Sequence, residues 1–191
     1  MNPSTSPTVA TGGPSLWQAL RRRWPAALGL AAAVVVLATG ADRETLAIVV
    51  GVATLCYLAA AVSGRRWMAW VAVLGASVVV AASEVTGLPW WIGMGAVALG
   101  LVVVGLLTRV PLATLGAQTA ALLGYGGLAV VALYLAPQAG PVLAGLVLAG
   151  HGVWDLVHYR RDRVVSRSLA EFCMLLDVPL GLGFVVLGAA L

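Results

Sequence analysis

Long apolar runs, separated by short polar segments, make up most of the chain. A helix needs about 20 apolar residues to cross a membrane, and inside the hydrocarbon only helices or closed barrels satisfy the backbone polar groups. The runs here are continuous and lack the alternation of barrel strands. They lie at residues 25–40, 45–63, 67–83, 88–107, 111–136, 141–158 and 168–191. The pattern predicts an all-α integral membrane protein, a bundle of seven transmembrane helices.

The N-terminal segment differs in composition from the rest. Residues 1–15 are rich in Pro, Ser, Thr and Gly, which is typical of disorder. We therefore expect a disordered tail at 1–15 and a single transmembrane domain at 16–191. The arginines at 21–23 before an apolar run resemble the start of a signal peptide. Because six further runs follow, we expect the first run to remain as an uncleaved anchor.

The composition agrees with a membrane protein. Hydrophobic residues make up 61% of the chain and charged residues 9%, whereas about 25% of the residues of a soluble domain are charged. The chain has no lysine, which excludes a retinal protein with a lysine Schiff base. Cys56 and Cys173 lie in different runs, so neither a disulfide nor a thiolate metal motif is expected.

The arginines indicate the orientation of the bundle. Every arginine except Arg43 lies before the first run or between the second and third, fourth and fifth, or sixth and seventh runs. In an alternating bundle these segments share one side, which the positive-inside rule places in the cytoplasm. We expect a cytoplasmic N-terminus, an external C-terminus and a location in a bacterial inner membrane. Since the basic residues serve topology, the net charge of +4 predicts no nucleic-acid partner.

Glycine is frequent inside the runs. In the fourth and fifth runs the glycines include Gly93, Gly95, Gly100, Gly105, Gly124, Gly126 and Gly127. Small residues let transmembrane helices approach closely. We therefore interpret these glycines as packing positions.

Ionisable side chains gather in the last two runs. The first five runs contain no charged residue, whereas the sixth has His151, Asp155 and His158 and the seventh has Glu171 and Asp177. A charge near the bilayer centre costs about 2.5–3.5 kcal/mol on insertion scales, so such groups persist where they have a partner or a function. The last two helices are therefore the predicted functional region.

Helical geometry brings these residues together. At about 100° per residue, His151, Asp155 and His158 share one face of the sixth helix. The sixth and seventh helices are antiparallel and joined by a short loop. This arrangement puts Asp177 at about the depth of His151, and Glu171 at the depth of Asp155 and His158.

Two further residues border the predicted site. Gln118, in the fifth run, approaches from the same side of the membrane and can join the cluster. Pro179 removes a backbone hydrogen bond within the seventh helix, so we expect a bend there. A bent helix that carries an acid is a suitable wall for a cavity beside Asp177.

Histidine and carboxylate side chains suit a divalent metal such as zinc, iron or manganese. We expect His151, Asp155 and Asp177 to be the ligands, with His158 or Glu171 as general base or as a partner of a ligand. At this depth the substrate would be a lipid-like or isoprenoid molecule that enters from the surrounding membrane lipids. The residues therefore favour a membrane-embedded, metal-dependent enzyme, with hydrolysis as the reaction.

The C-terminal part of the chain also resembles a known family. The motif consists of His151, Trp154, Asp155 and His158, followed by Cys173, Asp177 and Pro179. Over roughly the last 45 residues, this pattern resembles an uncharacterised family of small bacterial multi-pass membrane proteins, a domain of unknown function. The resemblance implies that these positions act as one unit and implies no particular activity. In general plan the arrangement also looks like the seven-helix intramembrane zinc hydrolases, although it lacks their three histidines.

Three other functions remain open. Without a metal, paired carboxylates could protonate a double bond of an isoprenoid or sterol, with the Trp154 ring stabilising the cation, as in an isomerase or cyclase. The same groups could form the proton relay of a transporter or channel, which would need a homo-oligomer because the chain is small. The polar network could also be structural and lock the two helices together.

Overall fold

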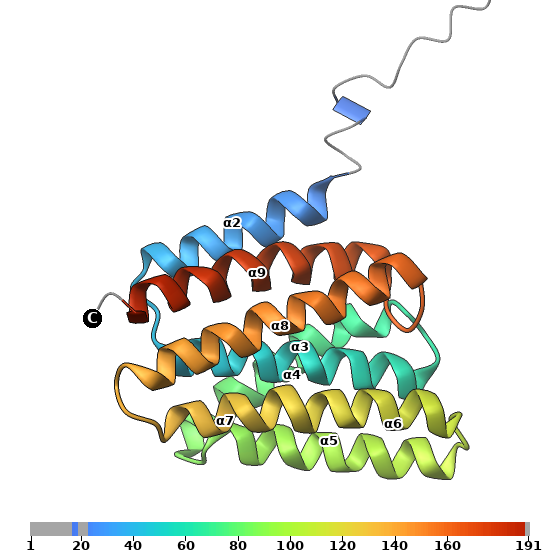
Figure 1. Cartoon of the computed structure of the whole chain (residues 1–191). Helices are drawn as coiled ribbons and strands as arrows, with labels where there is room; N and C mark the ends of the chain where they lie inside the picture. The colour runs from blue at the N-terminus through green and yellow to red at the C-terminus, as the bar shows by residue number, and fades with distance from the viewer. Residues whose placement is uncertain (1–16, 19–22, 190–191) are drawn as a thin grey trace, which may run out of the picture.

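The computed structural model describes residues 17, 18 and 23–189, and all regular secondary structure in that part of the chain is helical. The elements are α2 (Trp24–Ala38), α3 (Arg43–Ser63), α4 (Met68–Thr86), α5 (Trp90–Leu107), α6 (Leu112–Ala121), the π-helical turn η1 (Leu122–Gly126), α7 (Gly127–Leu133), α8 (Ala139–Arg161) and α9 (Arg167–Ala189). They form an antiparallel bundle, in which α6, η1 and α7 follow one another as a single rod (Figure 1). The predicted all-helical class is confirmed. The predicted tail at 1–15 lies outside the described residues.

Membrane-spanning length is reached by six helices within the described chain. They are α3, α4, α5, the rod Leu112–Leu133, α8 and α9, each with 18 to 23 residues. The first predicted run forms the helix α2, which is equally apolar but has 15 residues. The length and composition of these helices therefore support a multi-pass membrane protein.

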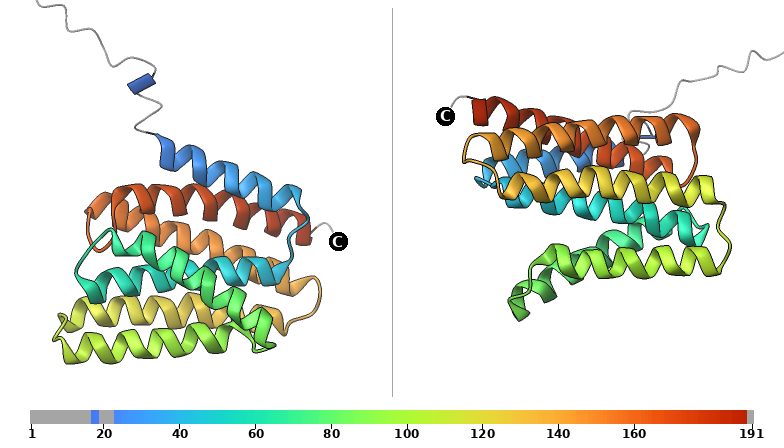
Figure 2. Two further views of the ribbon diagram at one scale, coloured as in Figure 1. Left: turned by 180° about the vertical axis from the view of Figure 1, so that it is seen from behind. Right: turned by 60° about the horizontal axis from the view of Figure 1, so that its bottom comes forward.

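Helix α3 occupies the centre of the bundle. It packs against α4, α5, the rod and α8, and 67% of its membrane-spanning window is buried. On one side, α8 and α9 form a tight hairpin, with α2 packed on the outside of α9. On the other side, α4 and α5 form a second hairpin of which only 17% and 22% of the windows are buried (Figures 1 and 2).

Capping residues explain where several helices begin and end. Asp42 precedes α3, and its carboxylate accepts a hydrogen bond from the Thr45 backbone N–H at 3.0 Å. This bond lowers the pKa of Asp42. Gly64 and Gly87 end α3 and α4 with φ of 63° and 69°, values that favour glycine. Each of these caps therefore uses the residue type that its backbone geometry requires.

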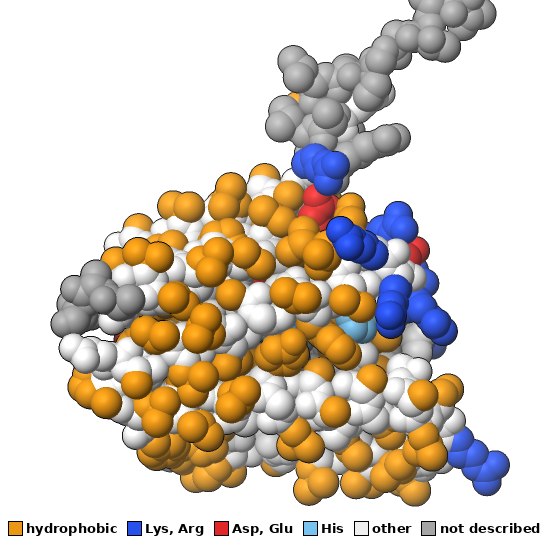
Figure 3. Space-filling model, viewed as in Figure 1, with side chains coloured by type: hydrophobic (Ala, Val, Ile, Leu, Met, Phe, Trp, Pro, Cys, Tyr) orange, Lys and Arg blue, Asp and Glu red, His pale blue; other side chains and the backbone are white. Residues whose placement is uncertain are grey.

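Arginines gather at one end of the bundle (Figure 3). The start of α2 and the α3–α4, α5–α6 and α8–α9 loops all lie at that end (Figure 1). Arg43 lies at the opposite end, where its Nη1 donates to the Leu135 carbonyl at 2.8 Å. The alternation predicted from the arginines is thus present in the fold for the described residues, which exclude Arg21 and Arg22.

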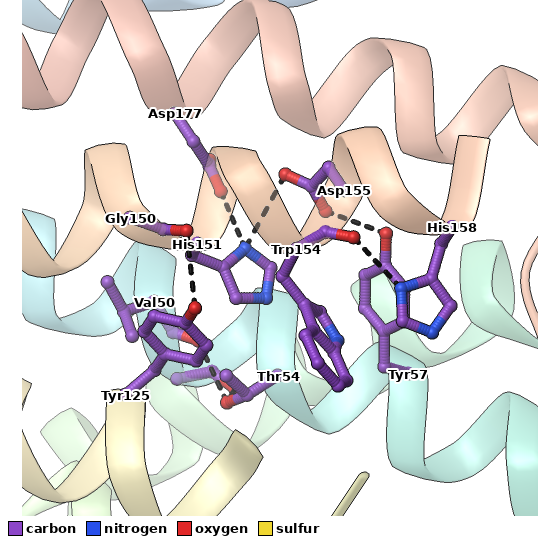
Figure 4. Close-up of polar contacts among 11 residues, drawn as sticks. Val50, Thr54, Tyr57, Tyr125, Gly150, His151, Trp154, Asp155, His158 and Asp177 are labelled. Atoms are coloured by element: carbon purple, nitrogen blue, oxygen red, sulfur yellow. Dashed lines mark hydrogen bonds and ion pairs between the residues drawn. The ribbon is translucent and has the colours of Figure 1, made fainter. Parts of the chain in front are cut away.

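Two backbone features lie in the rod and in α9. Helix α9 continues through Pro179 as one helix from Arg167 to Ala189, and the bend expected at the proline stays a prediction. The fifth predicted run contains the π-helical turn η1, which apolar patterning does not distinguish from an α-helix. Single π-helical turns occur frequently at functional sites, and this one carries Tyr125 toward the centre of the bundle (Figure 4).

The prediction that the glycines are packing positions is correct for only part of the set. A Cβ at Gly93 or Gly105 would lie 2.9 Å from side-chain atoms of Val79 or Leu115. A Cβ added at Gly126 would make ordinary contact with Thr54 at 3.9 Å, whereas at four further positions it would meet open space: Gly95, Gly100, Gly124 and Gly127. These four glycines leave room around the helices and do not bring them together. Sequence alone does not tell the two kinds of position apart, because both are glycines in apolar runs.

Candidate metal centre

Three side chains from α8 and α9 converge at the middle of the hairpin (Figure 4). The Nδ1 atom of His151 lies 2.8 Å from Oδ2 of Asp177 and 3.5 Å from Oδ2 of Asp155. One nitrogen or oxygen atom of each residue lies within 4.8 Å of the other two. All three residues have 0% exposure. The structure therefore brings together the three residues that the sequence predicts as metal ligands.

Close contact between the two helix backbones makes this convergence possible. A Cβ at Gly181 would lie 2.5 Å from the Gly145 carbonyl oxygen, and a Cβ at Gly145 would lie 2.5 Å from the Gly181 carbonyl oxygen. At Gly152, a Cβ would overlap the Val178 side chain. Because the helices approach this closely, the short Asp177 side chain reaches His151 on the facing helix.

Tyr57 on α3 is a member of the site that the sequence analysis missed. Its hydroxyl donates a hydrogen bond of 2.7 Å to Oδ1 of Asp155, and the residue is 1% exposed. The ring also makes edge contacts with His151 and His158, with centroid distances of 5.7 and 4.8 Å. A phenol in the middle of an otherwise apolar run was the available signal, because a buried Tyr hydroxyl needs a partner.

His158 lies beside the three-residue cluster and is not part of it. Its Nδ1 bonds to the Trp154 carbonyl oxygen at 2.9 Å, and its Nε2 lies 3.2 Å from Nε2 of Gln118. A carbonyl oxygen only accepts, so Nδ1 carries the hydrogen, and Nε2 of the neutral ring accepts from the Gln118 amide. The prediction that Gln118 joins this region is confirmed, and the Trp154 ring packs on His158 at 4.8 Å.

Glu171 faces a different neighbour from the one expected. Its Oε1 accepts a hydrogen bond of 2.8 Å from Nη1 of Arg23, at the start of α2. This contact raises the pKa of the Arg23 guanidinium. Glu171 and Asp177 are six residues apart, so they point about 120° apart around α9. Glu171 was expected at the depth of Asp155 and His158, but its side chain points toward α2 and pairs with Arg23, because direction around the helix also decides which neighbour it meets.

Several buried polar atoms have no hydrogen-bond partner among the described residues. They are Nε2 of His151, Oδ2 of Asp155, Oδ1 of Asp177, Nε1 of Trp154 and Oε1 of Gln118. Buried polar atoms in folded proteins are nearly always paired with protein, water or a bound group. Of these atoms, Oδ2 of Asp155 and Oδ1 of Asp177 belong to the three-residue cluster and are able to bind a water molecule or an ion.

The geometry and charge of the cluster suit a divalent cation. Two ligands that are each about 2.1 Å from one ion, at angles from 90° to tetrahedral, lie about 3.0–3.4 Å apart. The distances from His151 Nδ1 to the two carboxylates, 2.8 and 3.5 Å, bracket this range. A neutral imidazole, two carboxylates and a divalent ion together carry no net charge, which favours their burial in a membrane interior.

Comparison with known proteins does not assign this site to a family. No protein-family model matches the chain, and no curated protein or solved structure is significantly similar to it. The similarity to the uncharacterised membrane-protein family, carried by the HxxWDxxH motif, therefore stays a prediction.

Proposed function

We propose that this protein is a membrane-embedded, metal-dependent enzyme of a bacterial inner membrane, and that it hydrolyses a lipid-like substrate. The observation that carries the proposal is the fully buried triangle of His151, Asp155 and Asp177, whose ligand atoms lie within 4.8 Å of one another. When bound, a zinc, iron or manganese ion supplies Lewis-acid chemistry: it polarises a carbonyl or phosphoryl oxygen and activates water.

The surrounding residues have distinct roles in this proposal. Tyr57 holds Asp155 through its Oδ1, which leaves Oδ2 for the ion. His158, as a neutral imidazole hydrogen-bonded to Gln118, is the nearest further proton acceptor. Trp154 packs against the His158 ring and helps to hold it in place. Glu171 has no part in the chemistry, because it pairs with Arg23.

The proposal includes seven crossings, with α2 as the first and the arginine-rich end in the cytoplasm. Helix α8 ends at Arg161, so Asp155 and His151 lie about 9 and 15 Å from that end at 1.5 Å per residue. The site then lies inside the hydrocarbon region, nearer to the cytoplasmic face. A substrate reaches it most directly from within the membrane, which favours a lipid or isoprenoid.

The structure gives little support to a proton relay across the membrane. Beyond Asp177, α8 and α9 touch backbone to backbone at Gly145 and Gly181. The seventh helix carries no ionisable residue between Asp177 and its end at Ala189. A metal-free acid–base isomerase or cyclase has more support, because 2.8 Å between His151 and Asp177 is also the distance of a hydrogen bond.

Metal analysis of detergent-purified protein tests the proposal. We expect a stoichiometric amount of one divalent metal in the wild-type protein, and its loss in the Asp177→Asn variant, which keeps the side-chain shape. Glu171→Gln is the matched control: it removes an acid from the same helix and should keep the metal. Chelator-stripped wild-type protein should rebind zinc, iron or manganese ions. Wild-type protein that neither contains nor rebinds a metal would leave the acid–base enzyme as the better function.

A further inference from the structure

A cavity of about 300 Å³ lies between α3, α5 and the η1–α7 part of the rod. It extends from Trp90 and Trp91, at the end of the bundle opposite the arginines, toward the middle of the helices. Its lining is mainly hydrocarbon, including Leu55, Met94, Ala98, Leu122 and Val130. Leu123, which is 66% exposed on the outer surface, lies at its rim, so the cavity opens to the side that faces lipid.

Glycines create much of this space. A Cβ at Gly95 or Gly127 would meet no atom within 4 Å. Both residues line the cavity, on α5 and α7 respectively. Glycine in the middle of a helix is unfavourable by about 0.5–1 kcal/mol relative to alanine. No close helix contact requires a glycine at either position. The effect of the two missing side chains is therefore the open space in the cavity.

The lining offers contacts to hydrocarbon and little hydrogen bonding. The Thr54 hydroxyl already donates to the Val50 carbonyl at 2.9 Å. The Trp90 ring nitrogen already donates to Glu44 at 3.2 Å. An elongated apolar group satisfies such a lining, whereas a sugar or a charged headgroup leaves its polar atoms unpaired there.

Neighbouring residues of η1 contact the cavity and the candidate metal centre. Tyr125 lies in η1, with its ring centroid 5.3 Å from that of His151 in an edge contact, and its hydroxyl donates to the Gly150 carbonyl at 3.2 Å. Gly126, the next residue, lines the cavity opposite Thr54. The unpaired Nε2 of His151 is on the ring edge turned away from both carboxylates (Figure 4).

We propose that this cavity binds the hydrocarbon chain of a membrane lipid, an acyl or isoprenoid chain. The chain enters past Leu123 and lies along α5 and η1–α7, with its inner end against Thr54 and Gly126. The glycines at 95 and 127 determine the width of the cavity.

Photo-crosslinking with a diazirine-bearing fatty acid tests the cavity directly in the purified protein. We expect labelled peptides that contain Met94 and Leu122–Gly126. Gly95→Leu fills the cavity, so labelling of these peptides should fall about tenfold, which corresponds to about 1.4 kcal/mol of binding free energy. Gly100→Leu is the control, since it also adds a leucine on open space of α5 but outside the lining, and it should label like the wild type.

Metal content measured on the same samples separates the two proposals. Gly95→Leu protein that keeps its metal but loses labelling supports the cavity. Equal labelling in Gly95→Leu and Gly100→Leu would overturn the cavity proposal, because the probe would then bind only the outer lipid-facing surface. Labelling that depends on Gly95 in a protein without metal would keep the lipid site and overturn the metal-dependent function.

Discussion

The two sides of the bundle use glycine in opposite ways. In the α2–α9–α8 side, glycines such as Gly145 and Gly181 bring backbones into contact and close the space between helices. On the α4–α5 and rod side, Gly95 and Gly127 leave open space. The polar groups follow the same division: the buried ionisable cluster lies in α8 and α9, whereas α5 and the rod carry no charged residue. Under the two proposals above, the closely packed side holds the chemical site and the loosely packed side leaves room for a lipid chain.

Replacing one glycine with alanine on each side of the bundle should give the largest difference in stability between two variants. A Cβ at Gly181 meets backbone atoms that cannot turn away, so Gly181→Ala should destabilise the protein by about 1–3 kcal/mol. It should also weaken metal binding, because Asp177 lies one turn earlier on the same helix. Gly95→Ala should be neutral or slightly stabilising, since alanine favours helix. Reversible unfolding in detergent, followed by circular dichroism, measures the stability of both variants. Equal losses of stability would contradict the claim that only the α8–α9 glycines are needed for close packing.

Removing one hydroxyl from the buried site should give the next largest effect. In Tyr57→Phe, Asp155 loses the donor that orients it, and loss of such a partner typically costs 10- to 100-fold in metal affinity. Tyr125→Phe removes a hydrogen bond to the Gly150 carbonyl, which is not a ligand, and should leave the affinity nearly unchanged. Competition titration against a chelator gives both values. An equal loss in the two variants would mean that Tyr57 acts only through general stability.

A smaller effect is expected at the end of the bundle where α3 begins. Asp42→Ala removes the helix cap and should cost about 0.5–2 kcal/mol at neutral pH. The hydrogen bond from Thr45 lowers the pKa of Asp42 in the folded state. The carboxylate therefore stabilises the fold above the pKa it has in the unfolded chain, and this contribution disappears as the pH falls through the lower folded value. Unfolding measured against pH should show the wild type and Asp42→Ala converging in acid; a stability difference that persists in acid would contradict the capping role of the carboxylate.

The smallest effect should come from the ion pair between α2 and α9. Arg23 is 70% exposed at its side chain, so solvent and salt screen its attraction to Glu171. We expect Glu171→Gln to change the unfolding temperature slightly in low salt and not at all in high salt. A large, salt-independent change would show that Glu171 belongs to the buried site after all.

Much of the fold followed from hydrophobic patterning. The predicted run 45–63 corresponds to α3, Arg43–Ser63, and the run 88–107 to α5, Trp90–Leu107, because apolar length alone defines such helices. The π-helical turn and the division among the glycines did not follow from it. Both depend on what the neighbouring helix places opposite each residue, which a single sequence does not contain.

The site residues were predictable where both their depth along the helix and their direction around the helix axis were considered. On α8, spacing put His151 and Asp155 on one face, and the structure has them 3.5 Å apart. On α9, depth alone was considered, which correctly matched Asp177 with His151 but did not show that Glu171 points toward Arg23. Tyr57 was missed because it lies on a helix distant in sequence and its run carries no charge.

The most direct test of the central claim is X-ray absorption spectroscopy at the edge of the bound metal. The account predicts a first shell of imidazole nitrogen and carboxylate oxygen at about 2.0–2.2 Å, which disappears in Asp177→Asn. A shell with sulfur at about 2.3 Å would indicate Cys56 or Cys173 as ligands, and would contradict the assignment of the metal to His151, Asp155 and Asp177.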